Sequence, residues 1–221
     1  KNLLRSSFPL LMAALGQTLI ILTGGIDLSL GGIVALCNVV CVMSMNPDSA
    51  WGFVPALGAA AAVGLACGAV NGVLVTKGRL APIIVTIATT AVFDGMALLL
   101  MPNPGGSVHK AFAKFLTRGY SGAVPFLLFI LILCLVRSLA NSTPYGKALR
   151  AIGGSENAAY STGIRVGKIK FCAYCLAGLL CAVAGIFLSA QMNSADATIG
   201  KNYAMNAITA TVVGGTAMTG A

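Results

Sequence analysis

Six long runs of apolar residues, separated by short polar segments, limit this chain to few folds. They cover residues 8–23, 28–45, 51–75, 81–101, 123–139 and 169–190, and a weaker apolar stretch follows at 204–213. A helix needs about 20 apolar residues to cross the hydrocarbon core of a bilayer. Because a spanning segment must satisfy its own backbone hydrogen bonds, each run is expected to be a helix. The sequence therefore predicts an all-α polytopic membrane protein, a bundle of about six or seven transmembrane or broken helices in one transmembrane domain over residues 1–221.

The composition excludes the common soluble classes. Hydrophobic residues make up 57% of the chain and charged residues 9%, whereas an average soluble domain has about 25% charged residues. So few charges cannot cover the surface of a soluble enzyme of this length. The formal net charge is +9, but the basic residues gather between the apolar runs. This distribution is more typical of cytoplasmic loops of a membrane protein than of a nucleic-acid-binding surface.

The seven cysteines all lie within apolar runs, at Cys37, Cys41, Cys67, Cys134, Cys172, Cys175 and Cys181. We interpret all seven as small buried apolar residues, as free cysteines commonly are. Cys172 and Cys175 have CxxC spacing, but no second pair and no nearby histidine completes a zinc site. No metal site is expected, and the cysteines leave the redox compartment open.

The charged loops predict an orientation in the membrane. Residues 137–170 carry six basic residues and a single acid, Glu156, and the loop after the third run carries Lys77 and Arg79. Simple alternation places both loops on the same side, which the excess of positive charge identifies as cytoplasmic. Residues 102–122 then form a periplasmic loop. Its three basic residues are spaced by four and predict a short surface helix, either lying in the headgroup region or docking an external partner; they are Lys110, Lys114 and Arg118.

The junction between the first two runs, Thr23-Gly24-Gly25-Ile26-Asp27-Leu28-Ser29, contains almost nothing polar except Asp27 and its neighbours. Two adjacent glycines interrupt a helix easily. Asp27 and Ser29 are then expected to cap the next helix by accepting its free N–H groups. A broken helix at membrane depth is tolerated only where protein buries it or a cavity wets it, as at transporter solute sites. Asp27 is therefore either a structural cap, a residue lining a solute path, or both.

A similar pattern appears near the end of the sequence. Gly24 to Ser29 follow G-G-x-x-[LM]-[ST], and so do Gly214 to Thr219. Each follows an apolar stretch rich in threonine and β-branched residues. The echo is compatible with two structurally related halves, each with a broken helix, as in many transporters.

The run from Gly16 to Ser29 resembles the signature of ribose-type ABC importer permeases, the membrane subunits of bacterial sugar importers. Three further stretches, in the family's order, are similar to that family: Asn71–Val75 with Ala81–Thr86, Thr143–Ile164, and Ala207–Ile208 with Val212–Thr216. The resemblance implies a permease of roughly ten helices with two related halves. On that basis we expect the chain to be truncated at both ends. Two departures stand out: Ala204 replaces an acid that the family often has, and Asp94 is an acid that the family lacks.

The resemblance implies a permease subunit that moves a monosaccharide or similar small polar solute across the bacterial inner membrane by alternating access. The sequence has no GxxxxGK[ST] phosphate loop, so ATP–Mg is expected on partner ATPase subunits, and this chain is expected to hold no cofactor and no catalytic residue. The other expected partners are a second permease chain, an external solute-binding protein and membrane lipid, without nucleic acid.

Two groups of residues follow as candidates. The translocation path and helix break are assigned to Gln17, Thr23, Gly24, Gly25, Asp27, Ser29, Gly214 and Gly215. Residues 141–168 are interpreted as the cytoplasmic loop that couples to the ATPase, with contacts from Tyr145, Arg150, Gly153, Glu156, Ala158, Ala159 and Gly163. Both groups lie where apolar runs are interrupted or joined.

Three alternatives stay open. An ion-coupled secondary transporter would need several intramembrane ionisable groups, and only Asp27 and Asp94 qualify. An ABC permease for a nucleoside or a branched-chain amino acid is a more distant relative. A membrane enzyme would need a catalytic set, but the sequence has no HExxH motif and its single histidine, His109, stands beside Lys110 as a surface residue.

Overall fold

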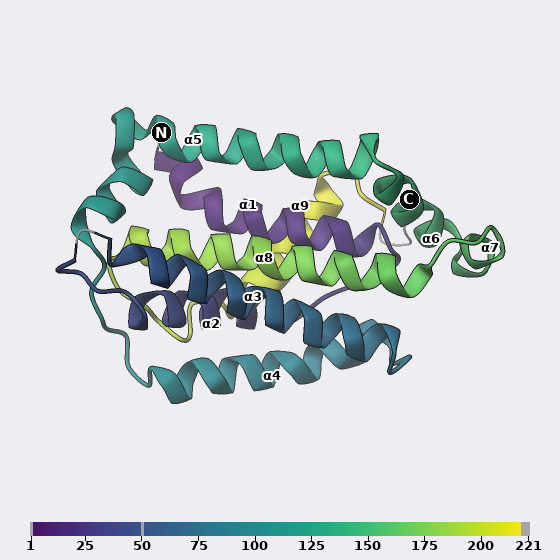
Figure 1. Ribbon diagram of the computed structural model, residues 1–221, viewed down its shortest axis with the longest axis horizontal. Coiled ribbons are helices and arrows are strands. Elements are labelled where there is room, and N and C mark those ends of the chain that lie inside the picture. The colour runs from purple at the N-terminus through teal and green to yellow at the C-terminus, as the bar shows by residue number, and fades with distance from the viewer. Residues whose placement is uncertain (1, 50, 218–221) are drawn as a thin grey trace.

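The computed structural model describes residues 2–49 and 51–217, leaving aside the side chains of residues 2–4 and 120–122. The chain is a bundle of helices whose axes run roughly along one direction (Figure 1). In chain order the helices are α1 (Asn2–Ile21), α2 (Leu30–Met43), α3 (Phe53–Thr76), α4 (Pro82–Leu100), α5 (Lys110–Ser142), α6 (Pro144–Gly154), α7 (Glu156–Ser161), α8 (Val166–Met192) and α9 (Tyr203–Val213). Among the described residues, extended pairing is limited to one bridge between Gly105 and Ala195. The predicted all-α class is confirmed.

Each predicted apolar run corresponds to a helix. Five of the seven agree to within three residues at both ends, whereas α1 and α5 begin six and thirteen residues before their runs. By length and composition, α3, α4, α8 and residues 123–142 of α5 can cross a membrane, whereas α2 and α9 are apolar but short. α2 has 14 residues, of which twelve are buried. It lies inside the bundle against α3, α4 and α8, and α8 also packs on α1 and α3. A short helix that is apolar on all sides can be buried in this way only where longer helices surround it.

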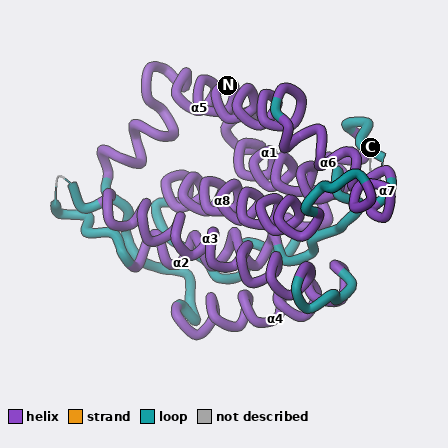
Figure 2. The backbone as a smooth tube through the Cα atoms, turned by 45° about the vertical axis from the view of Figure 1, so that its right-hand side comes forward, coloured by secondary structure: helices purple, strands orange, loops and turns teal. Residues whose placement is uncertain are grey.

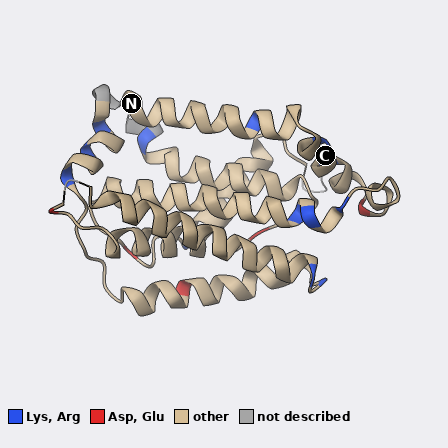
Figure 3. Cartoon of the chain, in the orientation of Figure 1, with Lys and Arg blue, Asp and Glu red and all other residues tan. Residues whose placement is uncertain are grey.

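The two ends of the bundle differ. The chain segments 77–81 and 143–165 lie at one end, which we call the basic end; residues 44–49, 51–52, 101–109 and 193–195 lie at the opposite end (Figures 1 and 2). Lysine and arginine also occur at the opposite end, and the middle of the bundle is almost free of charge (Figure 3). Lys77, Arg79 and residues 143–165 therefore share one end, as the alternation of runs predicts.

Small residues allow α3 and α8 to touch along their backbones. A Cβ added to Gly64 would stand 2.5 Å from the carbonyl oxygen of Gly178, and one added to Gly68 would stand 2.3 Å from that of Tyr174. Both distances are shorter than a carbon–oxygen contact can be, so only glycine fits at these positions. The Gly64-x-x-x-Gly68 spacing predicts close packing between membrane helices, and α3 packs closely on α8 at both glycines.

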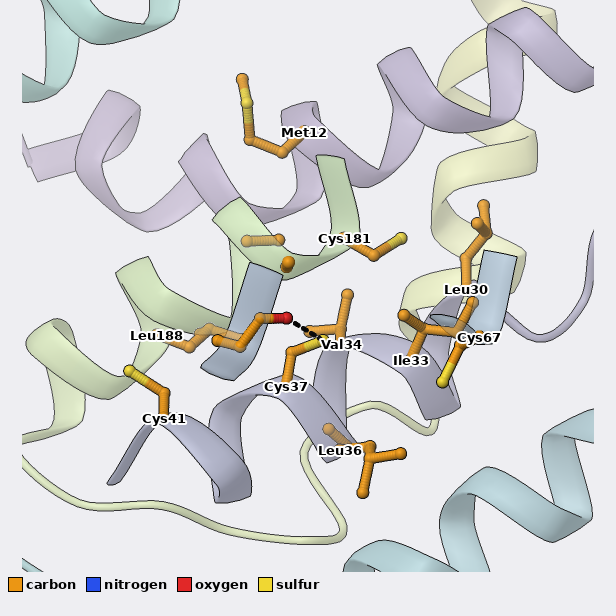
Figure 4. Packing of buried hydrophobic residues seen from close by; sticks show 14 of the residues in the cluster. Met12, Leu30, Ile33, Val34, Leu36, Cys37, Cys41, Cys67, Cys181 and Leu188 are labelled. Carbon is orange, nitrogen blue, oxygen red and sulfur yellow. Dashed lines mark hydrogen bonds between the residues drawn. The ribbon is translucent and has the colours of Figure 1, made fainter. Parts of the chain in front are cut away.

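Cysteine burial only partly follows the prediction. Cys37, Cys41, Cys67 and Cys181 are buried, and Cys37 donates its thiol proton to the carbonyl oxygen of Ala60 at 3.5 Å (Figure 4). Cys134 and Cys172 are exposed and Cys175 is half-buried, so the prediction that all seven are buried is wrong. These three lie on the outward faces of α5 and α8. An apolar run on a membrane helix indicates surroundings of lipid or protein equally, which is why hydrophobicity misled the assignment.

The short surface helix predicted within residues 102–122 is not separate. Residues 110–142 form one helix, α5, which changes direction near its start (Figure 2). Lys110, Lys114 and Arg118 are exposed on its first part, as their spacing predicts, while Ala113 and Thr117 are buried. The helix runs on through Pro125, which lies inside it.

Candidate functional site

The first interruption of the bundle is the turn that ends α1. The N–H group of Gly25 donates to the carbonyl oxygen of Ile20 at 3.2 Å, and Gly24 adopts φ +75°. This is the Schellman arrangement, in which a left-handed residue, usually glycine, ends a helix and satisfies its last carbonyl groups. Residues 25–29 then connect this turn to α2, which begins at Leu30.

Asp27 lies at the centre of this turn and is 1% exposed. Its Oδ1 accepts hydrogen bonds from the backbone N–H of Ser29 at 2.7 Å and from the Ser29 hydroxyl at 2.6 Å. The side chain of Ser29, the residue before α2, makes no capping hydrogen bond. The predicted cap is therefore wrong in detail: the Asp27 carboxylate stabilises the turn before α2 and does not accept N–H groups from the first turn of that helix.

Three further buried side chains surround Asp27. The Gln17 amide takes the orientation that satisfies both of its polar atoms. Its nitrogen donates to the backbone carbonyl of Asp27 at 3.0 Å, and its oxygen accepts from the backbone N–H of Asp27 at 3.3 Å. The amide of Asn71, on α3, donates to the Ser29 hydroxyl at 2.7 Å. The Tyr174 hydroxyl, from α8, lies 3.5 Å from where a Cβ on Gly25 would stand.

We call these five residues, Gln17, Asp27, Ser29, Asn71 and Tyr174, the break cluster. Each is at most 2% exposed. The Oδ1 atom of Asn71 and the hydroxyl of Tyr174 have no hydrogen-bond partner among the described residues. The cluster joins the turn to α1, α3 and α8. In this conformation it is sealed, so any role for Asp27 in a solute path requires the surrounding helices to separate.

The remaining predicted residues of the first break differ in exposure. Thr23 is buried and donates its hydroxyl proton to the carbonyl oxygen of Ile20 at 2.7 Å, whereas Gly24 is exposed. The turn thus has one accessible residue and a closed interior.

The second interruption is the segment between α8 and α9, which sequence reasoning missed. It contains the same local turn as the first: the Oδ1 of Asp196 accepts from the N–H and from the hydroxyl of Thr198, both at 2.8 Å. Asn38 of α2 holds the segment in the bundle, because its Oδ1 accepts from the N–H of Asp196 at 3.0 Å and its amide donates to Ser189 at 2.8 Å. The Asp-x-Ser/Thr spacing at 27–29 and 196–198 was the available signal.

The second segment brings the start of α9 against the start of α2. A Cβ on Gly31 would stand 2.3 Å from the carbonyl oxygen of Gly200, so the two backbones touch. A Cβ on Gly32 would stand 3.1 Å from Oδ1 of Asp94, which is half-buried on α4. Asp94 thus faces the meeting point of α2, α4 and α9, which we call the α2–α9 junction.

Both Gly-Gly pairs end a helix in the same way. The left-handed residue is the first glycine of one pair, Gly24, and the second glycine of the other, Gly215. Thr216 donates its N–H to the carbonyl oxygen of Thr211 at 3.3 Å and Gly215 adopts φ +96°, which is the closure seen at Gly25 and Gly24. Each pair therefore ends a helix, α1 or α9. These helices lie side by side (Figure 1). The end of the echo, Met218 and Thr219, lies outside the described residues.

The predicted coupling loop forms α6 and α7 at the basic end. Thr143 caps α6 by accepting from the N–H of Gly146 at 3.2 Å, and Ser155 caps α7 by accepting from the N–H of Ala158 at 3.3 Å. Ile152, Ala159 and Val166 form a small apolar core under the two helices. This core connects the loop to the start of α8.

The polar residues expected to contact a partner all bind within the chain. The Tyr145 hydroxyl donates to the carbonyl oxygen of Ile169 at 3.4 Å, and burial raises the pKa of that hydroxyl above its ordinary value. Arg150 donates to the Ala140 carbonyl at 3.2 Å and to the side chain of Asn141. Glu156 pairs with Lys170 at 2.5 Å.

The outward face of the loop carries a different set of residues. Ala158 and Gly163 are exposed, with Gly163 at φ +83°, while Gly153 is half-buried and Ala159 is buried. Tyr160, which sequence reasoning missed, is 75% exposed beside a cavity of about 620 Å³. A large exposed aromatic side chain is typical of a protein–protein contact, and only the position of α7 reveals which tyrosine of the loop faces outward.

Comparisons with known proteins add a family. A family model described as branched-chain amino acid transport system, permease component, matches residues 1–221. The chain is 40% identical to the ribose import permease protein RbsC of Bacillus subtilis (strain 168), over 99% of this chain and 69% of that protein. It is 34% identical to the fructose import permease protein FruF of Bifidobacterium longum (99% and 63%) and 32% identical to the autoinducer 2 import system permease protein LsrD of Photorhabdus temperata (92% and 63%). No solved structure matches the chain.

Proposed function

This chain belongs to the permease family of branched-chain amino acid transport systems, and we propose that within this family it imports a monosaccharide or a similarly small polar solute. It is a transmembrane subunit of an ABC importer, a multi-pass protein of the bacterial inner membrane. Relatives named as ribose, fructose and autoinducer 2 import permeases support the sugar class. Neither a secondary transporter nor a permease for nucleosides or branched-chain amino acids is favoured by these relatives.

The break cluster supports a neutral polar solute. The amides of Gln17 and Asn71 and the hydroxyls of Ser29 and Tyr174 are hydrogen-bonding groups without charge, and Asp27 is the single acid among them. Sugar hydroxyls pair well with such groups, because each can donate or accept. We infer that the path residues assigned from sequence, from Gln17 to Ser29, become accessible when the ends of α1 and α2 separate. Gly214 and Gly215, which end α9, give the second flexible helix end on that path.

Coupling to ATP follows from how α6 and α7 sit on α8. The family implies partner ATPases, which hold ATP–Mg, and an external solute-binding protein. A push on α7 reaches α8 through Ile152, Ala159 and Val166, and α8 packs directly on α2. Packed helices move as units, so the push is transmitted to the middle of α2, where Gly185 meets Val34 and Asn38. The exposed residues Ala158, Tyr160 and Gly163 are the proposed ATPase contacts, and Tyr145, Arg150, Gly153 and Glu156 hold the loop in shape.

A second permease chain is proposed to complete the path. α4 and α5 expose many large apolar side chains, among them Ile84, Leu99 and Leu131. Such faces suit lipid or another membrane helix. The break cluster is the observation that carries the proposal as a whole, because a buried polar interruption within an apolar bundle has no evident use in a purely structural membrane protein.

Uptake into vesicles tests the function. The complete importer, with its ATPase and binding protein, is reconstituted and given radiolabelled ribose, fructose or leucine, with ATP inside or outside the vesicles. We expect uptake of a sugar, and not of leucine, only when the ATPase has ATP. An ATPase variant unable to hydrolyse ATP is the control. Uptake driven by an ion gradient without any ATPase subunit contradicts the proposal.

A further inference from the structure

α3 and α8 separate at the basic end after touching along most of their length. A Cβ would stand 2.5 Å from the facing backbone at Gly64 and 2.9 Å from the ring of Phe171 at Gly72, but at Gly167 it would stand 3.9 Å from Thr76. The gap is a cavity of about 570 Å³. Its lining consists of Val73, Thr76, Lys77, Gly167, Lys168, Phe171 and Cys172.

Two lysines stand at this cavity without a compensating acid. Lys77 and Lys168 are exposed, and within the described residues neither makes an ion pair. The nearby Lys170 differs, because Glu156 neutralises it at 2.5 Å. No aspartate or glutamate lines the cavity. The site therefore carries two positive charges that attract an anion.

The rest of the lining is apolar and faces sideways out of the bundle. Val73 is 39% exposed and Cys172 is also exposed, whereas Phe171 is half-buried. Val70, one turn further along α3, is exposed on the same side. The Gly167 N–H, in the first turn of α8, has no acceptor among the described residues. Polar donors at the end of a membrane helix, above an apolar floor, match a molecule with an anionic head and an apolar tail.

We propose that the cavity between α3 and α8 binds an anionic phospholipid, with its phosphate between Lys77 and Lys168 and its acyl chain along Val73 and Phe171. Basic pockets between transmembrane helices on the cytoplasmic side bind the head groups of such lipids. A free phosphate would leave the apolar floor uncovered, so the lipid is the better fit. The site lies beside α7 and the start of α8, which places the lipid next to the coupling loop. The proposal goes beyond the transport function and does not depend on which solute is carried.

Native mass spectrometry of the complete importer tests the site. The importer is taken from nanodiscs of phosphatidylcholine that contain a small fraction of phosphatidylglycerol, and the phosphatidylglycerol retained is counted. The test variant is Lys77→Gln with Lys168→Gln. The matched control is Lys147→Gln with Lys201→Gln, which removes two exposed lysines that do not line this cavity. A third variant, Gly167→Leu, fills the cavity without changing the charge.

Each basic residue near the membrane surface contributes roughly fivefold to the affinity for an anionic lipid, so the test variant is expected to lose roughly thirtyfold. The control is expected to stay near the wild-type value, and Gly167→Leu is expected to lose the lipid despite both lysines. Equal losses in test and control variants, or no loss in the test variant, overturn the proposal. So does displacement of the lipid by glycerol phosphate at equal concentration, since that assigns the site to a free anion. Loss of the ATPase subunits with unchanged lipid would reassign the surface to a protein contact.

Discussion

The two interruptions of the bundle share one turn and differ in how it is held. At both, an aspartate accepts from the N–H and the hydroxyl of the residue two positions on, in Asp27 with Ser29 and in Asp196 with Thr198. The first turn is sealed among side chains from α1, α3 and α8. The second is half-buried and held mainly by backbone contact and by Asn38. The same local chemistry can therefore form either a closed cluster or an accessible junction, depending on which helices surround it.

The largest effect is expected where the second interruption touches α2. Gly31→Ala places a methyl group 2.3 Å from the Gly200 carbonyl oxygen, and forcing the backbones apart is expected to cost about 3 kcal/mol. The control is Gly95→Ala, at a helical glycine with open space around its Cβ position, which is expected to stabilise the protein slightly. Thermal unfolding of the purified importer in detergent measures both. Equal melting temperatures for the two variants contradict the close contact.

Next in size is the difference between the two aspartates. Asp27→Ala removes a buried charged acceptor of two hydrogen bonds and is expected to cost about 2–3 kcal/mol. Asp196→Ala removes the same pair of bonds from a half-buried turn and is expected to cost about 1 kcal/mol or less. Thermal unfolding of both variants is the measurement. If Asp196→Ala is as damaging as Asp27→Ala, burial does not distinguish the two turns.

The asparagines that hold the two turns give a smaller contrast. Asn38 bonds to Ser189, Gly185 and Asp196, whereas Asn71 is seen to make one bond, to Ser29. Asn38→Ala is therefore expected to cost about 2 kcal/mol and Asn71→Ala about 1 kcal/mol. The double variant Asn71→Ala with Asp27→Ala should be less damaging than the sum, because both act on Ser29. Strict additivity in unfolding measurements would falsify the break cluster as a unit.

The smallest effect on stability is expected from the charges at the α2–α9 junction. Asp94 is half-buried and Lys201 is exposed, so Asp94→Asn or Lys201→Gln is expected to change the free energy of unfolding by no more than about 1 kcal/mol. Both variants are expected to slow ATP-driven uptake, because Asp94 faces the start of α2 and Lys201 lies just before α9. Uptake equal to wild type in both variants would show that the charges of Asp94 and Lys201 do not contribute to transport.

The helices were predictable because their signal is local. Each apolar run reports its own helix, and the starts and ends agree with the structure to within a few residues at α4, α8 and α9. The Gly-Gly pairs were correctly expected to interrupt helices, since a left-handed turn depends on glycine itself. The turn at Asp27 was located correctly. The donors to its carboxylate were assigned wrongly, because they belong to Ser29, two residues on, and not to the first turn of α2.

The features that sequence reasoning missed depend on tertiary contacts. No local pattern reveals that Asn71 and Tyr174 meet at Ser29 and Gly25, or that Asn38 receives the N–H of Asp196. Tyr160 and Tyr145 stand in the same loop, and only the packing of α6 and α7 decides that Tyr145 is half-buried and Tyr160 exposed. The exposed cysteines show the same limit, because lipid-facing and protein-facing sides of a membrane helix can have equal hydrophobicity.

The central claim is that ATP-driven motion opens the break cluster, and cysteine accessibility tests it most directly. A water-soluble maleimide is applied to vesicles containing the complete importer with Thr23→Cys, and labelling is read at each site by mass spectrometry. Thr23 is 5% exposed, and the native Cys37, buried on α2, is the internal control. We expect residue 23 to be protected without nucleotide and labelled during ATP turnover, with Cys37 unlabelled throughout. Active uptake with residue 23 protected in every state would contradict the account.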